Sequence, residues 1–366
     1  MKKIRVMLVD DSAFIRVALK NIIECEDITI CGVARDGLDA LEKVKLYLPD
    51  VIMLDVEMPN MNGLEFLKEY MKNPKRASVI MFSSLTREGA DVTLQALNLG
   101  AVDFLLKPTK YELDKLENLR ERFRQHIRAA AGVDVQKVAE NLKKLQLSDK
   151  PKVEPIKPEI SKAPAQPIKS LLKPSKKIEL CLIGTSTGGP PALQKVFECF
   201  QENLPFPIVV VQHMPKGFTK SLAERLDAIS KLEVKESEQG DIVKPGRALI
   251  AQAGYQIGFM RQNNEIVIKH IMPKAEDLFK PAVNDMIFNA MQVVKPENIL
   301  CVIMTGMGND GLLGIRELKK QGSFVIAESE ESAVVFGMPR VVVKENLADK
   351  ILPVWEIGKE IVNLAK

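Results

Sequence analysis

Three residues that together could perform nucleophilic catalysis follow three separate apolar runs in the second half of the chain. Ser186 lies in a glycine-rich stretch, Ile183 to Pro190, between a predicted strand and a predicted helix. His213 and Asp310 also come just after predicted strands. A serine becomes a nucleophile when a base within hydrogen-bonding reach takes its proton and an acid orients that base. Because functional groups of a parallel sheet collect at the carboxyl ends of its strands, we expect the three residues to meet.

The same glycine-rich stretch is also compatible with a dinucleotide-binding turn. In such a turn, glycines let the backbone approach a pyrophosphate at the N-terminus of a helix. Ser186, however, stands where that motif has its second glycine, and the next predicted strand ends in Gln212 and His213 instead of an acidic residue. These departures favour the nucleophile, and nucleotide binding remains the weaker alternative.

Carboxylates gather at predicted strand ends in the first part of the chain as well. Asp10 and Asp11 follow the first strand and Asp55 the third, while Ser83 ends the fourth and Lys107 follows the fifth. Three carboxylates this close would repel one another unless a cation lay between them, and oxygen ligands suit Mg²⁺. A phosphoryl group drawn to that cation could be attacked by Asp55, with Lys107 neutralising another of its oxygens.

Alternating strands and helices must position both groups of residues. Strand-like runs in the first part cover residues 4–9, 29–34, 51–54, 79–82 and 102–105. Those in the second part cover 178–183, 208–212, 248–251, 299–304 and 324–327, with a hairpin at 256–270 around Asn263-Asn264. Repeated strand–helix units predict parallel sheets covered on both faces. The predicted fold class is therefore α/β, with two doubly wound parallel-sheet domains.

A proline- and lysine-rich segment without aromatic residues, residues 148–177, separates the two parts. Such a composition cannot bury enough apolar surface to offset its ordering entropy, so it predicts an extended linker. The expected organisation is a first domain at 1–125, a helical extension (about 134–147) and linker within 126–177, and a second domain at 178–366.

Composition argues against several classes of protein. The 366 residues carry 52 basic and 48 acidic side chains, a net charge of +4. The linker alone holds eight lysines against three acids, a net of +5, which leaves −1 for the remainder and argues against a nucleic-acid-binding output. Five cysteines without CxxC spacing predict neither a disulfide framework nor a zinc cluster. Because no apolar run reaches about 18 residues, we expect a cytoplasmic protein.

The first 125 residues resemble a response-regulator receiver domain. The segments that carry the resemblance are Val9 to Ser12, Leu54 to Pro59 with Asn62-Gly63, Phe82 to Ser84, and Asp103 to Pro108. The resemblance implies a flavodoxin-like fold and phosphorylation of Asp55. It further implies Mg²⁺ bound by Asp10, Asp11 or both, together with Asp55 and the Glu57 carbonyl. Ser83 would follow the phosphoryl group and Phe104 would be an aromatic switch, beside Lys107.

The second domain resembles the CheB family of chemotaxis methylesterases and, with the receiver, extends the resemblance to nearly the whole chain. Its marks are Ile183 to Pro190, Gln212 to Met214, Gly306 to Gly311, and Ala333 to Pro339. The resemblance implies a Rossmann-like domain with Ser186 as nucleophile, His213 as general base and Asp310 as its orienting acid. The amides of Met307 and Thr187 would form the oxyanion hole, and the ester chemistry would need no cofactor.

The family resemblance also implies substrates and partners. The substrates would be glutamyl methyl esters, and some glutamines, on the cytoplasmic helices of chemoreceptors, with a chemotaxis histidine kinase as phosphodonor. Contact with the membrane would come only through the receptors, and nucleic acid would not be a partner. The unphosphorylated receiver would pack over the catalytic edge. One departure stands out, because many members have Pro-Gly-x-x-His where this chain has Ala251 to Gln256. An adaptor without esterase activity remains an alternative.

Overall fold

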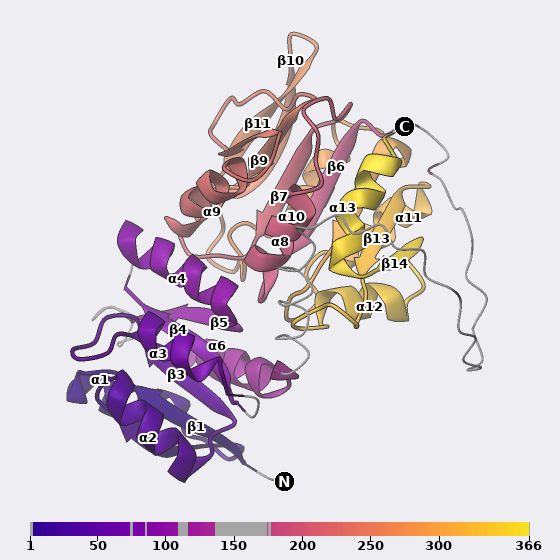
Figure 1. Ribbon diagram of the computed structural model, residues 1–366. Coiled ribbons are helices and arrows are strands. Elements are labelled where there is room, and N and C mark those ends of the chain that lie inside the picture. The colour runs from indigo at the N-terminus through magenta and orange to yellow at the C-terminus, as the bar shows by residue number, and fades with distance from the viewer. Residues whose placement is uncertain are drawn as a thin grey trace, which may run out of the picture.

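The computed structural model describes residues 3–73, 76–84, 86–108, 116–135, 174 and 177–365. In these residues the chain forms two α/β domains, drawn in indigo to magenta and in rose to yellow in Figure 1. The helix expected at 134–147 and most of the expected linker lie outside the described residues. The predicted fold class, two doubly wound parallel-sheet domains, is confirmed.

The first domain has a five-stranded sheet in the order β2-β1-β3-β4-β5, with every neighbouring pair parallel. Its strands are β1 (Ile4–Val9), β2 (Ile28–Ala34), β3 (Val51–Asp55), β4 (Ser78–Ser83) and β5 (Asp103–Leu106). Its helices are α1 (Ala13–Ile23), α2 (Gly37–Tyr47), α3 (Gly63–Tyr70), α4 (Arg87–Leu99) and α6 (Leu116–Ala131). This strand order is the flavodoxin-like one, whose functional edge lies beside β1 and β3.

Local sequence explains where these helices begin and which faces they cover. Ser12 caps α1 by accepting a hydrogen bond from the Ile15 amide, and Asn62 with Glu65 forms a capping box on α3. Apolar side chains of α1 and α6 pack on one face of the sheet, and those of α2, α3 and α4 pack on the other. The boundary expected at residue 125 falls inside α6, whose buried Ile127 and Ala130 belong to the core of the first domain.

The second domain has a seven-stranded sheet in the order β14-β13-β12-β6-β7-β9-β8, again parallel throughout. Its strands are β6 (Leu180–Thr185), β7 (Ile208–Gln212), β8 (Glu233–Glu236), β9 (Arg247–Ile250), β12 (Ile299–Ile303), β13 (Phe324–Glu328) and β14 (Lys350–Leu352). Its helices are α8 (Gly189–Phe197), α9 (Phe218–Asp227), α10 (Val283–Ala290), α11 (Leu312–Lys320), α12 (Met338–Lys344) and α13 (Val354–Asn363), with a 3₁₀ turn η1 (Pro296–Asn298).

All five strands predicted in this domain are present, and two more were missed. The missed strands, β8 and β14, are four and three residues long and form the two edges of the sheet. Short, charged edge strands give little hydrophobic signal, which is why the sequence pattern did not reveal them. The predicted hairpin is confirmed as β10 (Gln256–Gln262) and β11 (Glu265–Ile271). Asn263 and Asn264 form its turn with positive φ, as a two-residue hairpin loop requires.

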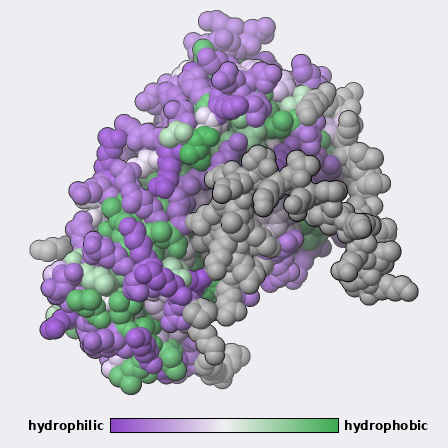
Figure 2. Space-filling view, in the orientation of Figure 1, coloured by the Kyte–Doolittle hydropathy of each residue, from purple (hydrophilic) through white to green (hydrophobic). Residues whose placement is uncertain are grey.

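The two domains meet through α4, which lies on the side of the first domain facing α8 and α9 (Figure 1). On the visible face, Figure 2 shows apolar side chains in separate groups among hydrophilic ones. Among the described residues, no helix is both long and apolar enough to cross a membrane.

Gly63 offers a test of how tightly the end of β3 is packed. A β-carbon at this position would overlap the carbonyl oxygen of Asp55, which is backbone and cannot move aside easily. We expect Gly63→Ala to lower the free energy of unfolding of the first domain by about 1–3 kcal/mol, measured by urea denaturation. Gly132→Ala is the matched control, because its nearest neighbour would be an ordinary 3.5 Å away. Equal stability of the two variants would contradict this packing.

Candidate active site and phosphorylation site

Ser186, His213 and Asp310 are brought to one edge of the second sheet. They follow β6, β7 and β12, which are adjacent in the order β12-β6-β7. The Ser186 amide donates to the Thr305 carbonyl, 3.0 Å away, and the Gln212 side chain donates to the Ser186 carbonyl at 2.9 Å. The turn that carries the serine is thus tied to both neighbouring strand ends. Only 9% of Ser186 is exposed, so the serine is buried in this structure.

The glycines after Ser186 serve packing. Gly188 has a φ of 77°, a left-handed conformation that glycine adopts without strain. A β-carbon on Gly188 would meet Val334, and one on Gly189 would meet Gln212 and Thr185. Protein side chains therefore lie directly against both glycines, where a dinucleotide motif would need open space for a ligand.

Asp310 is the most completely satisfied acid of this edge. Its carboxylate lies 2.8 Å from His213 Nε2 and accepts hydrogen bonds from the amides of Val283, Asn284 and Gly311. Burial raises the pKa of Asp310, but the hydrogen bond and charge of His213 and the Asn284 and Val283 amides outweigh burial, so the pKa lies below its ordinary value. Asp310 is consequently an anion at neutral pH.

The contact with Asp310 determines which nitrogen of His213 can act as a base. An anionic carboxylate beside Nε2 favours the tautomer that carries its proton there, which leaves the lone pair on Nδ1. His213 Nδ1 is buried and has no hydrogen-bond partner among the described residues, Ser186 included. A buried nitrogen without a partner is available for proton transfer, and catalytic hydrogen bonds often form only when substrate binds.

Two amides in this region could stabilise an oxyanion. In the described part of the chain, no carbonyl accepts a hydrogen bond from the backbone amides of Met307 or Thr187. Met307 lies in a loop held by Gly306, whose amide donates to Val335 and whose carbonyl accepts from Gly337 and Met338. Free amides on a fixed loop can receive negative charge without reorganisation.

The Thr187 side chain is engaged with the other domain. Its Oγ1 donates to Asp103 Oδ2 at 2.8 Å, and the same oxygen lies 2.6 Å from His126 Nδ1. Beside this contact, Phe104 stacks on Phe218 with ring centroids 5.0 Å apart. The residue next to the candidate nucleophile is therefore hydrogen-bonded to β5 of the first domain.

Two further contacts continue the interface along α4. Arg87 pairs with Glu224 of α9 at 3.0 Å, and Asn98 donates to Gln194 of α8 at 3.0 Å. The first domain thus lies directly against the edge that holds Ser186.

The acids of the first domain also come together as predicted. One carboxylate oxygen from each of Asp10, Asp11 and Asp55 lies within 4.8 Å of the others. Lys107 Nζ is 2.7 Å from Asp55 Oδ2 and 3.1 Å from Asp10 Oδ2. Burial disfavours the ammonium of Lys107, but the hydrogen bond and charge of Asp55, with those of Asp10, outweigh burial and raise its pKa.

Asp55 is the acid of this group whose ionised form is disfavoured by burial. Burial raises its pKa from 3.8 to about 6, with a further contribution from the Asp10 charge, although Lys107 opposes the rise. Asp10 Oδ2 is buried and makes no hydrogen bond of good geometry, despite the nearby Lys107. One lysine does not neutralise these carboxylates. Oxygen donors with an unsatisfied buried atom fit a hard cation such as Mg²⁺.

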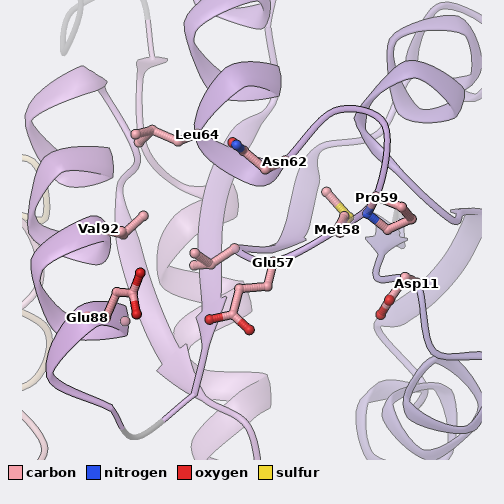
Figure 3. A pocket seen from close by; sticks show the side chains of 10 residues that line it. Asp11, Glu57, Met58, Pro59, Asn62, Leu64, Glu88 and Val92 are labelled. Atoms are coloured by element: carbon pink, nitrogen blue, oxygen red, sulfur yellow. The ribbon is translucent and has the colours of Figure 1, made fainter.

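The remaining residues expected at this edge lie around Asp55. The Glu57 amide is 3.4 Å from Asp55 Oδ1, and Ser83 Oγ donates to the Gly89 carbonyl at 3.3 Å. Glu57, Asp11 and Glu88 line an open hollow of about 640 Å³ beside the acid group. Figure 3 shows Glu57 and Glu88 reaching into this hollow from the loop after β3 and from α4. The approach to Asp55 is therefore acidic.

Comparison with known proteins identifies the chain. Residues 181–361 match the CheB methylesterase family and residues 6–120 match the response regulator receiver domain. A protein-glutamate methylesterase/protein-glutamine glutaminase of Thermotoga maritima is 42% identical over 365 residues, 99% of this chain and 98% of that protein. The chain belongs to the CheB methylesterase family.

Another relative agrees with this assignment to the CheB methylesterase family. A Pyrococcus abyssi protein of the same description is 40% identical over 363 residues, 99% of this chain and 93% of that protein. The crystal structure of the Thermotoga maritima CheB methylesterase catalytic domain is 42% identical, covering 52% of this chain and 100% of that one, with a TM-score of 0.49. In this CheB-family chain, the first domain is a response-regulator receiver domain.

Sequence reasoning missed three residues at these sites. Asp103 begins a receiver motif, but nothing in its local pattern indicates that it binds Thr187 of the other domain. His126 lies in an arginine-rich helical stretch, where a surface histidine is the ordinary expectation. Phe279, whose ring stacks on His213 with centroids 4.0 Å apart, lies in an irregular segment without a recognisable motif.

The raised pKa of Asp55 gives a test of the receiver site. A rise from 3.8 to about 6 corresponds to about 3 kcal/mol in favour of the neutral acid. The folded-state pKa lies above the unfolded one. The free energy of unfolding should therefore fall as pH rises from 3.8 to about 6, and it should stay low at higher pH. We expect Asp55→Asn to stabilise the metal-free receiver by about 1–3 kcal/mol near neutral pH, and less in acid.

Hydrogen exchange of β1 and β3 amides measures this effect, because the single tryptophan, Trp355, lies in the second domain. Asp11→Asn, which changes an exposed member of the same acid group, should have a smaller effect. A destabilised Asp55→Asn in metal-free buffer would show that burial is not the dominant influence on this group.

Proposed function

We propose that this protein is a serine hydrolase that removes methyl groups from glutamyl methyl esters of chemoreceptors and also deamidates receptor glutamines. The observation that carries the proposal is His213, whose Nε2 contacts the Asp310 carboxylate at 2.8 Å while its buried Nδ1 has no partner in the described residues. This leaves a candidate base after β7, the strand next to β6, which carries Ser186 at its end. Membership in the CheB methylesterase family supports the substrate class.

The reaction follows from these positions. His213 Nδ1 would take the Ser186 Oγ proton as Oγ bonds to the ester carbonyl carbon, and the carbonyl oxygen would become an oxyanion at the Met307 and Thr187 amides. As the tetrahedral intermediate collapses, His213 would return the proton to the departing methoxide, which leaves as methanol. A water molecule, deprotonated by His213, would then attack the acyl-enzyme, and His213 would return this proton to Ser186 Oγ as the glutamate is released. With glutamine, ammonia leaves in place of methanol.

Asp310 would act through His213 alone. Its lowered pKa keeps it anionic, so it holds the imidazole in the required tautomer and stabilises the imidazolium formed when Ser186 loses its proton. Each amide of an oxyanion hole typically contributes on the order of 100- to 1,000-fold in rate. The ester chemistry in this scheme uses only these side chains, the amides and water.

Regulation by the receiver is the second part of the proposal. The contacts of Asp103 with Thr187 and of Phe104 with Phe218 place β5 against the catalytic edge, where Ser186 is buried. A receptor helix could not reach the serine while this contact persists. We infer that the closed arrangement is the resting state, and that phosphorylation of Asp55 by a chemotaxis histidine kinase shifts the population towards an open one.

The phosphorylation site and the interface share β5 and its following residue. Lys107 contacts Asp55 and comes just after β5, the strand that carries both Asp103 and Phe104. A phosphoryl group on Asp55 would attract Lys107 and the Ser83 hydroxyl, and Phe104 could leave Phe218 as β5 readjusts. Asp10, Asp11, Asp55 and the Glu57 carbonyl would hold Mg²⁺, which supplies positive charge for the phosphoryl oxygens. The protein would act in the cytoplasm, meeting membranes only through receptors, with no nucleic acid as partner.

Ser186→Ala tests the hydrolase. We expect methanol release from methylated receptor membranes to fall by about 10⁴-fold or more, since the nucleophile is lost. Phosphorylation of Asp55 by a small phosphodonor should be retained. Ser221→Ala, which changes a buried serine of α9, should keep its activity. Undiminished turnover by Ser186→Ala would exclude this nucleophile, and no turnover by the unaltered protein with a phosphodonor would favour an adaptor.

Asp103→Ala tests the closed resting state. The variant loses a buried hydrogen bond between Thr187 and a carboxylate, worth about 1.5–3 kcal/mol, so activity without phosphodonor should rise about tenfold or more. Methanol release with and without phosphodonor is the measurement, and the added effect of phosphorylation should shrink.

Two further variants make this result interpretable. Asp27→Ala removes a carboxylate paired with Arg128 inside the receiver and should leave the resting activity unchanged. Arg87→Glu, which opposes Glu224 across the interface, should raise resting activity by a smaller factor at low salt. Resting activity that stays at the original level in both Asp103→Ala and Arg87→Glu would rule out occlusion by this interface.

A further inference from the structure

Gln256 lies where the chain departs from the Pro-Gly-x-x-His pattern, and it is buried. Only 3% of this residue is exposed, and it is the first residue of β10. An amide side chain removed from water must find partners for its NH₂ and its oxygen, or burial is costly. The identity of these partners therefore indicates what the residue does.

The Gln256 side chain joins both ends of one short segment. Its Nε2 donates to the Phe279 carbonyl at 2.8 Å and to Asp277 Oδ2 at 3.1 Å, while its Oε1 accepts from the Ala282 amide at 2.7 Å. The neighbouring Gly254 amide adds a hydrogen bond to the Lys280 carbonyl at 2.9 Å. The irregular segment 277–282 is thus fixed to the start of β10.

The middle of this segment covers the candidate base. The rings of Phe279 and His213 are stacked, with centroids 4.0 Å apart and planes only 2° from parallel. A ring held against one face of the imidazole limits its rotation and keeps water from that face. The carbonyl of the same Phe279 is the group that Gln256 holds, so the position of the ring depends on this hydrogen bond.

The end of the segment leads to the candidate orienting acid. After Ala282, α10 begins, and its first two amides, Val283 and Asn284, donate to the Asp310 carboxylate at 2.6 and 3.0 Å. The N-cap residue, Ala282, has no polar side chain to cap this helix, and Asp310 and Gln256 instead accept from three of the donors at its beginning. The position of these amides depends on where Gln256 holds Ala282.

We propose that Gln256 is a positioning residue, which through Phe279 and the start of α10 holds both His213 and Asp310 in the geometry for proton transfer. The proposal rests on the hydrolase function proposed above and assigns Gln256 no contact with substrate. Glutamine suits the task because one planar group donates to two oxygens and accepts from one amide. A carboxylate at this position could not donate to the Phe279 carbonyl and would oppose Asp277.

Gln256→Met in the full-length protein is the direct test, because methionine has a similar shape and none of these hydrogen bonds. With phosphodonor present, kcat for methanol release should fall about 10- to 100-fold while KM changes by less than about twofold, since only an interaction made in the reaction step is lost. Phe279→Ala should reproduce the loss of kcat, and Phe279→Tyr, which keeps the stacked ring, should restore it.

A second measurement is independent of turnover. The chain has three histidines, so ¹⁵N-histidine labelling gives a small set of ring signals, and loss of one set in His213→Gln identifies His213. In the unaltered protein, His213 should show the Nε2–H tautomer, whereas in Gln256→Met its signals should move towards a mixture of tautomers. Gln252→Met is the matched control, because that side chain donates to Glu236 outside the segment.

The two measurements separate the possible failures. Absence of methanol release by the unaltered protein would overturn the proposed hydrolase function. In that case, comparison of the His213 tautomer in the unaltered protein and in Gln256→Met would still show whether Gln256 positions His213. An unchanged tautomer and unchanged kcat in Gln256→Met would overturn the positioning role. If Gln256→Met does not fold, a normal tautomer and normal kcat in Phe279→Ala would overturn it equally.

Discussion

Removing a carboxylate from water is the physical constraint on which both functional edges depend. Each domain buries an acid at the end of a strand, and the number of its donors determines its state. Asp310 accepts from three backbone amides, and despite burial the contact with His213, with the Asn284 and Val283 amides, lowers its pKa and keeps it charged. Asp55 has Lys107 and the distant Glu57 amide beside another buried acid, which leaves its pKa near 6. Asp310, whose hydrogen-bond acceptors are occupied, is suited to orient a base. Asp55, which has fewer donors, is suited to react or to bind a cation together with its neighbours.

A third buried acid, Asp103, connects the two edges. Its two oxygens serve Phe104 within the receiver, His126 of α6, and Thr187 of the catalytic domain. The hydrogen bonds continue from Thr187, whose carbonyl accepts from Thr305 Oγ1, to the loop that presents Met307. One carboxylate thus belongs to the packing of both domains. Displacement of β5 would break the hydrogen bond to Thr187, next to Ser186, without any movement of the catalytic sheet itself.

The sequence was sufficient to predict the parts of the structure that depend on hydrophobic periodicity and on the order of strands and helices along the chain. Apolar runs predicted the strands that carry the acids, the serine and the histidine, because a parallel sheet brings their carboxyl ends together. It was insufficient where contacts join distant segments without a pattern of their own. Phe279 lies 66 positions from His213, and Asp103 lies 84 from Thr187. Gln256 was recognised as a departure, but its role required the positions of Phe279 and Ala282.

The stacked pair of Phe104 and Phe218 has a thermodynamic consequence. Under the proposed regulation, the Phe104 ring either stacks on Phe218 or rotates towards the interior of the receiver domain. It cannot do both, so the two arrangements exclude each other. Linkage then requires that the effect run in both directions with equal size. A receptor segment bound at the catalytic edge would displace Phe104 and make the receiver hold its phosphoryl group more favourably. Substrate would thereby act as an effector of the domain that controls access to it.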